Sequence, residues 1–291
     1  MKQGFSRNKL KYIVNEQFFD TWSPQMAYIL GFTFADGNIY RTSLSWDIQR
    51  RDLNILKKIN KALESTYKIK LQRRKSYRLR MNNRILIGGA VKMGLLPKKN
   101  IRDTLPTVPS ELLRHFVRGY LDGDGWIVVR RNRNEIDLGF CSGNKEFLND
   151  LCLTIAKSLN IKLANVRKRL KLTPKKIIST TYMVEYYSAN AFKIAQWLYK
   201  DLQTNDLFME RKYRTYLQAN KLNNYLQSGT KIVRVVQRKI GKPIKEILED
   251  LHLDKKYDGV KIARILKIHS SSVYRWLART GIKYPIKRTY G

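Results

Sequence analysis

The chain has 291 residues, and its 58 Lys and Arg against 23 Asp and Glu give a net charge of +35. Such a charge indicates a polyanionic partner, above all nucleic acid. The 17 Tyr, 10 Phe and 5 Trp favour packed cores and argue against a ribosomal-type basic tail. No apolar run approaches the length that crosses a membrane, so we expect no membrane partner.

The N-terminus and the cysteines bear on the compartment. Residues Met1 to Arg7 lack the apolar segment of a signal peptide. The two cysteines, Cys141 and Cys152, have no metal-finger spacing and are too few for a disulfide framework. We therefore expect an intracellular protein of the cytoplasm, the nucleoid or an organelle matrix.

Residues 1–20 are basic and weakly patterned, which predicts an N-terminal arm. The first half, residues 21–108, opens with a helix at Pro24, since Ser23 can cap it and proline suits the first helical position. Two strands, a helix, two strands and a helix follow, at Asn38–Arg41, Ser43–Arg50, Asp52–Thr66, Lys68–Arg74, Tyr77–Asn82 and Asn83–Leu95. The three prolines of Leu96–Pro109 indicate a connector.

The second half, residues 109–220, repeats this order. Its elements are expected at Ser110–Gly123, Trp126–Arg131, Glu135–Ser142, Lys145–Leu159, Lys162–Leu172, Thr180–Ser188, Asn190–Lys200 and Leu207–Gln218. An internal repeat of this size predicts an α+β fold of two αββαββα halves, related by a pseudo-twofold axis, each with a four-stranded antiparallel sheet.

The first helix of each half contains the same stretch, Ala27–Gly37 in one copy and His115–Gly125 in the other. Gly31 aligns with Gly119, on a stripe of mostly small residues that lets two helix backbones approach closely. The two helices are therefore expected to form the seam between the halves. The glycines at positions 37 and 125 are expected to end them in the left-handed conformation.

An aspartate closes each copy, Asp36 in the first and Asp124 in the second. The helix macrodipole disfavours negative charge at a C-terminus, and two carboxylates side by side also repel each other. A divalent cation bound by both, with the backbone carbonyls of Ala35 and Gly123, would remove both penalties. A buried helix with an Asp-Gly turn would explain one copy, but two copies in register favour a metal site.

The pair of stretches, 88 residues apart, resembles the two LAGLIDADG motifs of a single-chain homing endonuclease. The resemblance covers roughly residues 20–220. It implies a monomer that hydrolyses both strands of a long double-stranded DNA target and leaves 3′ overhangs. Asp36 and Asp124 would be catalytic, one for each strand, with Mg²⁺ or Mn²⁺ as cofactor; Ca²⁺ is expected to bind without supporting cleavage.

Many members of this family carry Gln and Lys near the end of the second strand of each half. Gln49 fits the first-half position, and Arg50 stands where the lysine is often found, so the resemblance implies a catalytic role for both. In the second half Ser142 and Gly143 occupy the similar place. The basic catalytic residue of that half is therefore left unassigned.

Positive charges recur on one face of the predicted strands in both halves. An ordinary solvated face would mix the two signs. We therefore expect the sheets to form a saddle whose Lys and Arg contact phosphates and whose polar side chains read base edges. The expected DNA contacts in this saddle are Arg73, Arg74, Arg78, Arg80, Arg130, Arg131, Arg133, Arg167, Lys168 and Arg169.

Residues 221–239 are expected to be a linker, and residues 240–291 a small all-α module. Its predicted helices are Pro243–Leu251, Val260–Leu266 and Ser272–Arg279, the last capped by Ser270 or Ser271 and ended by Gly281. Ala263 at the helix crossing, with Ile268 and Val273 in the core, resembles a helix-turn-helix. Ser271, Tyr274 and Arg275 would then face DNA. A plain helical hairpin is the alternative.

Two further readings stay open on the same scaffold. One is a non-cleaving DNA-binding regulator, and the other is a maturase that assists splicing, with intron RNA as a partner. The presence of both motif acids favours the nuclease. The chain starts with Met1 and ends with Gly291, unlike an intein with Cys or Ser first and His-Asn last, so we expect an intron-encoded or free-standing protein.

Overall fold

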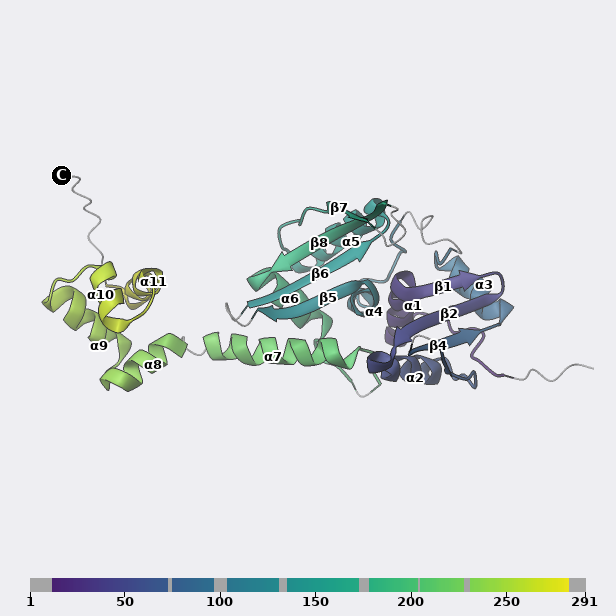
Figure 1. The fold of residues 1–291 in the computed structure, drawn as a ribbon, viewed down its shortest axis with the longest axis horizontal. Helices are drawn as coiled ribbons and strands as arrows, with labels where there is room; N and C mark the ends of the chain where they lie inside the picture. The colour runs from purple at the N-terminus through teal and green to yellow at the C-terminus, as the bar shows by residue number, and fades with distance from the viewer. Residues whose placement is uncertain are drawn as a thin grey trace, which may run out of the picture. The chain divides into compact units, whose positions relative to one another are not determined.

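The computed structural model describes residues 12–72, 75–96, 104–130, 135–172, 178–203, 205–227 and 231–282. Its contacts divide the chain into two units, Met1–Asn220 and Lys221–Gly291. Each unit buries its own hydrophobic core. Figure 1 shows the order of the elements along the chain. Among the described residues, no helix combines the length and the apolar character that a membrane crossing requires.

The first half of the larger unit has one four-stranded antiparallel sheet, in the order β1-β2-β4-β3. A short 3-10 turn, η1 (Arg50–Asp52), leads from β2 into α2. The helices and strands are α1 (Pro24–Asp36), β1 (Gly37–Tyr40), β2 (Ser43–Gln49), α2 (Leu53–Ala62), β3 (Lys70–Leu71), β4 (Ser76–Met81) and α3 (Arg84–Lys92).

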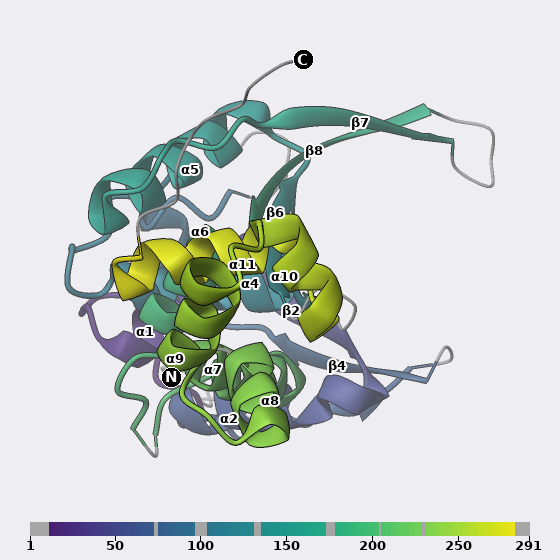
Figure 2. The same ribbon diagram turned by 90° about the vertical axis from the view of Figure 1, so that its left-hand side faces the viewer.

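The second half repeats the arrangement with the order β5-β6-β8-β7. Figure 2 shows β7 and β8 as a long hairpin that projects beyond the helices. The elements are α4 (Leu113–Asp124), β5 (Gly125–Arg130), β6 (Glu135–Ser142), α5 (Lys145–Leu159), β7 (Arg167–Leu172), β8 (Ile178–Tyr187) and α6 (Ser188–Leu198). The predicted α+β fold of two αββαββα halves is confirmed.

Each sheet has one face in the core and one face turned outward. In β2 the side chains of Leu44, Trp46 and Ile48 are buried, whereas Asp47 and Gln49 are exposed. This alternation follows from the period of two in a strand. The outward faces are the ones for which DNA contacts were expected.

The seam between the halves is made by α1 and α4, which pack along each other. A Cβ atom added to Gly31 would lie 2.0 Å from the carbonyl oxygen of Phe116, and one added to Gly119 would lie 2.1 Å from the carbonyl oxygen of Tyr28. Real Cβ atoms do not approach that closely, so only glycine fits at either position. The predicted seam through these glycines is confirmed.

The ends of the motif helices differ from the expectation in two ways. Gly37 and Gly125 are extended, with φ of −75° and −120°, because each helix passes straight into a strand. Glycine is required there by crowding, since a Cβ atom on Gly37 would lie 2.6 Å from the carbonyl oxygen of Thr33. The second motif helix begins at Leu113, and Ser110 does not cap it.

The segment expected to be a linker, residues 221–239, is helical over most of its length. Helix α7 (Glu210–Gln227) crosses the unit boundary, and α8 (Lys231–Ile240) follows. Residues 221–227 and 231–239 contain no Gly or Pro that would break a helix, and α8 buries Val236 in the second core. The random coil that a linker implies is therefore absent from these described residues.

The smaller unit continues with α9 (Ile244–Leu248), the π-helix η3 (Glu249–Asp254), α10 (Gly259–Leu266) and α11 (Ser270–Thr280). Asp258 caps α10, and the left-handed Gly281 ends α11 as predicted. The cap of α11 is the side chain of His269 and not a serine. Val273, Trp276 and Leu277 attach α11 to the core of the unit.

Candidate functional site

The two motif acids lie at the same end of the seam. Asp36 is the last residue of α1, Asp124 is the last residue of α4, and both are half-buried. A Cβ atom added to Gly123 would lie 2.3 Å from Cβ of Ala35 and 3.3 Å from the backbone nitrogen of Asp36. The two helix ends therefore touch through backbone and small side chains.

This donor set fits a hard divalent cation. The described residues hold no cluster of three or more His, Cys, Asp or Glu side chains that could enclose a metal ion. Mg²⁺ does not need such a cluster, because it binds through one or two carboxylates and takes its remaining ligands from water and substrate phosphates. Asp36 and Asp124 supply one carboxylate from each half at adjoining helix ends.

Lys212, on the first turn of α7, also belongs to this region, although no sequence motif indicated it. Its side chain is 2% exposed, and its ammonium donates to the backbone carbonyls of Leu121, Asp122 and Gly125 at 2.5, 2.9 and 2.7 Å. Burial lowers the pKa of Lys212 to about 8. The negative charge of Asp36 is one of the influences that raise this pKa and so oppose the effect of burial. Lys212 therefore caps the C-terminal carbonyls of α4 directly beside the motif acids.

Asp122, two residues before Asp124, has a separate role. Its buried carboxylate accepts hydrogen bonds from the hydroxyl of Tyr28 and the backbone N–H of Met209, both at 2.7 Å. Burial raises the pKa of Asp122, while the charge of Lys212 lowers it. Asp122 thus ties α1 and α4 to Met209, the residue before α7.

The first turn of α7 also holds the first half of the unit. Arg211 donates to both carboxylate oxygens of Asp52 at 2.9 and 3.1 Å, and Glu210 accepts from the side chain of Asn54. Lys212, the next residue, bonds to the second half. Three consecutive residues therefore clamp both halves together beneath the ends of the motif helices.

The proposed polar partners of the acids lie at the ends of the second strands. Gln49 and Arg50 are exposed where β2 passes into η1. In the second half the position equivalent to Gln49 is Gly143. Gly37 pairs with Trp46 and Gly125 with Phe140, and Gln49 and Gly143 each lie three residues further on. Cys141 contacts the motif acid there, with its thiol donating to the carbonyl oxygen of Asp124 at 3.1 Å.

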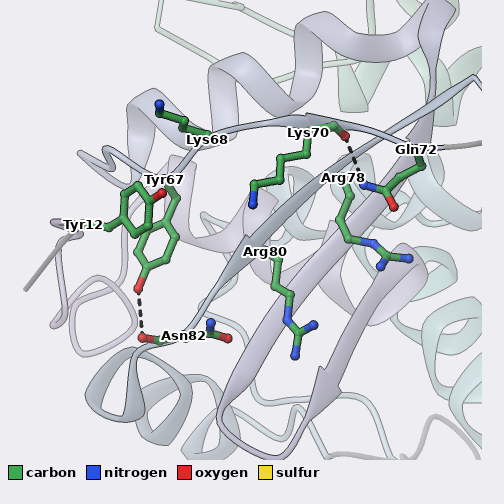
Figure 3. A pocket seen from close by; sticks show the side chains of 8 residues that line it. All are labelled: Tyr12, Tyr67, Lys68, Lys70, Gln72, Arg78, Arg80 and Asn82. Carbon is green, nitrogen blue, oxygen red and sulfur yellow. Dashed lines mark hydrogen bonds between the residues drawn. The ribbon is translucent and has the colours of Figure 1, made fainter.

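Basic side chains surround a hollow of about 620 Å³ on the outward face of the first sheet, as Figure 3 shows. Arg78 forms an ion pair with Asp47, and its Nε donates to both carboxylate oxygens, at 2.9 and 3.0 Å. Arg80 is exposed. The lining is completed by Tyr12, Tyr67, Lys68, Lys70, Gln72 and Asn82.

The second sheet also carries expected contacts on its outward face. Arg130 forms an ion pair with Asp137, and Arg167 and Arg169 are exposed on β7. Lys168 is on the opposite face, because it pairs with Tyr182, which packs toward the core. The expectation that three consecutive residues share one face was wrong, since strand side chains alternate. Arg73, Arg74, Arg131 and Arg133 lie outside the described residues.

In the smaller unit, the three residues expected to face DNA are exposed on α11. Ser271 lies in its first turn, followed by Tyr274 and Arg275. The ring of Tyr274 also covers Gly259 at the start of α10, where a Cβ atom would lie 2.6 Å from it. Lys267, in the left-handed conformation, makes the turn between the two helices.

The comparison with protein families concerns the second half. Residues 111–195, from the start of the second motif helix into α6, match the family model for the LAGLIDADG-like domain. The same order of elements, the glycine of the motif helix and its terminal aspartate recur in the first half.

Similar proteins were found by sequence and by structure. A probable translation initiation factor IF-2 of Methanocaldococcus jannaschii is 28% identical over 178 residues, which are 57% of this chain but only 14% of that protein. Among solved structures, the I-LtrWI LAGLIDADG homing endonuclease bound to target DNA is 9% identical, with 74% and 92% of the two chains covered and a TM-score of 0.46. The I-SmaMI LAGLIDADG homing endonuclease bound to cleaved DNA is 11% identical, with 72% and 91% covered and a TM-score of 0.44.

Proposed function

We propose that the chain is a site-specific, Mg²⁺-dependent endonuclease that cuts both strands of a double-stranded DNA target. The proposal rests on one observation. Asp36 and Asp124 end two helices that pack closely through their glycines. A packed helix pair does not need an acid at both C-termini, where the macrodipole disfavours it. The LAGLIDADG-like domain in the second half gives independent support.

The chemistry follows from the carboxylates. Asp36 and Asp124 would hold Mg²⁺, which when bound stabilises charge on a phosphodiester and lowers the pKa of a water molecule. Lys212 keeps the end of α4 fixed by binding the carbonyls of Leu121 and Asp122 in the helix and that of Gly125 just beyond it. Gly37, the residue after Asp36, pairs with Trp46, and the exposed Gln49 and Arg50 follow three and four residues later. There they can orient a phosphate of one strand. One acid from each half supports the cutting of both strands by a monomer with 3′ overhangs.

The substrate class follows from the charge. The outward face of the first sheet gathers Lys68, Lys70, Arg78 and Arg80, and that of the second sheet bears Arg130, Arg167 and Arg169. These side chains suit phosphates and guanine edges of a duplex. In the smaller unit, Ser271, Tyr274 and Arg275 support a helix-turn-helix that contacts DNA through α11.

Replacement of the acids tests the assignment. The target is first selected from random duplexes by the wild-type protein and then placed in a supercoiled plasmid. With Mg²⁺ we expect the wild type to linearise the plasmid, and Asp36→Asn or Asp124→Asn to leave at least one strand uncut. Affinity for the duplex should stay nearly unchanged, because neither acid makes a phosphate contact. Asp201→Asn, at an exposed position distant in sequence, is the matched control.

The same assay separates the competing functions. Linearisation at the wild-type rate by the Asp36→Asn, Asp124→Asn double variant would show that the two acids are not the metal ligands. Specific binding without cleavage in any divalent cation would instead support a non-cleaving regulator. Tighter binding to a structured intron RNA than to any duplex would support a maturase.

A further inference from the structure

The two sheets present opposite chemistry at equivalent places beside the motif acids. In the first half, Asn38 pairs with Ser45, which pairs with Arg80. In the second half, Trp126 pairs with Gly139, which pairs with Glu185. We call these the proximal rows, because each begins two residues after its motif aspartate.

The equivalence of the proximal rows follows from the register. Gly37 and Gly125 directly follow the motif acids, and they pair with Trp46 and Phe140. The next outward residues along the first and second strands are therefore equivalent in the two halves. Arg80 and Glu185, one cross-strand neighbour further on, occupy the same place in the two sheets with opposite charge.

The side chains of the second-half row are held in place by specific contacts. A Cβ atom on Gly139 would lie 2.2 Å from Cζ2 of the Trp126 indole, so the glycine makes room for the ring to lie across β6. Glu185 is half-buried and accepts a hydrogen bond from the hydroxyl of Tyr187 at 2.8 Å. Arg130, the nearby cation, is already paired with Asp137. A carboxylate is thus fixed on a face where phosphates would repel it.

Resting on the proposed function, we propose that the proximal rows make the DNA target asymmetric: Arg80 reads a guanine, and Glu185 reads a cytosine at the equivalent place of the other half-site. Arginine bonds the O6 and N7 atoms of guanine, whereas glutamate accepts from the N4 amino group of cytosine. A carboxylate in the groove is favourable only beside such a donor. The indole of Trp126 covers the apolar side of this reading position.

The test is the consensus that the full-length protein selects from duplexes with a long randomised stretch, in Ca²⁺. For the wild type we expect guanine at one position and cytosine at its equivalent in the other half-site. Glu185→Gln should move the second preference from cytosine toward adenine, which glutamine bonds through N6 and N7. We expect the affinity for the wild-type consensus to fall about tenfold, and the rest of the consensus to stay the same.

Two controls make the result decisive. Glu146→Gln, exposed on α5, changes the charge equally away from this face and should leave the consensus unaltered. Arg80→Gln, at an exposed position, should relax only the guanine position, so the proposal can be tested even if the Glu185 variant does not fold. A Glu185→Gln consensus equal to that of the wild type would overturn the inference, with Glu185 serving only Tyr187. Absence of any wild-type consensus would instead overturn the proposed site-specific function.

Discussion

Single residues of the second motif show how burial separates the roles of one residue type. Asp122 and Asp124 are two positions apart, yet Asp122 is 1% exposed and bonded to α1 and α7, whereas Asp124 is half-buried at the helix end. A helix turns 200° over two residues, so the two side chains face different surroundings. Asp124, like Asp36 in the first half, is the last residue of its helix.

Acid should destabilise the larger unit through His115. Burial, and next the guanidinium of Arg118, lower the pKa of His115 from 6.5 to about 4. Between these values the unfolded chain binds a proton that the folded chain does not, so the free energy of unfolding falls as the pH decreases from 6.5 toward 4. Denaturant melts across this range should show a steeper fall for the wild type than for His115→Gln.

Other acidic groups also titrate in this range, so the informative quantity is the difference between wild type and variant. Parallel slopes for the two proteins would contradict the prediction. In the folded protein, His115 Nδ1 lies 3.0 Å from Nη2 of Arg118, and the neutral imidazole can accept a hydrogen bond from this guanidinium. A glutamine oxygen can replace that acceptor, which makes the variant a conservative one.

At the scale of elements, the seam depends on two glycines in opposite helices. Each faces a backbone carbonyl of the other helix at a distance that excludes any side chain. The acids follow at fixed offsets of five residues from these glycines, so the separation of the helix axes also sets the separation of the acids. A change at the seam should therefore alter both stability and catalysis.

Gly31→Ala provides that change with a single methyl group. Its Cβ would lie 2.0 Å from the carbonyl oxygen of Phe116, which belongs to the backbone and cannot rotate away. We expect a loss of about 1–3 kcal/mol in the free energy of unfolding, together with loss of cleavage. Gly88→Ala in α3 is the control: no atom lies within 4 Å of its added Cβ, so its stability should stay equal or rise. Equal stability of the two variants would disprove the close seam.

Element types were predictable because they depend on local patterns, and the fold class followed from their repetition. The helix α5 (Lys145–Leu159) and the strand β6 (Glu135–Ser142) have the predicted bounds, set by the Asn144 cap and by alternation. The role of Lys212 was not predictable, because it depends on α7 returning to α4 after 88 residues. The sequence also could not show that Arg78 and Arg130 would be bound to nearby aspartates.

At the scale of the whole molecule, two separate cores imply two separately folding units. The larger core contains residues from Val14 to Ala219, and the smaller one from Val236 to Ile282, with no member in common. The helices on both sides of residues 228–230 replace the random coil that a polar linker would provide.

Removal of residues 228–291 should leave the larger unit folded and still able to cut. We expect weaker binding and a nuclease footprint shortened on one side only, with the same scissile positions, because both motif acids lie in the larger unit. The salt dependence of binding should also become shallower, since the truncated protein has fewer phosphate contacts. Identical footprints for full-length and truncated protein would show that the smaller unit does not contact DNA.

The glycine contacts at the seam also have an evolutionary consequence. They use main-chain carbonyls of Phe116 and Tyr28, which any amino acid in those places would supply. These two contacts therefore require glycine on one helix but no particular side chain at the facing carbonyl, which eases the recombination of halves of different ancestry. Bonded pairs such as Tyr28 with Asp122, Asp52 with Arg211 and Asn54 with Glu210 are among those such a recombinant must inherit together. A lineage built this way can acquire a new recognition sequence one half at a time.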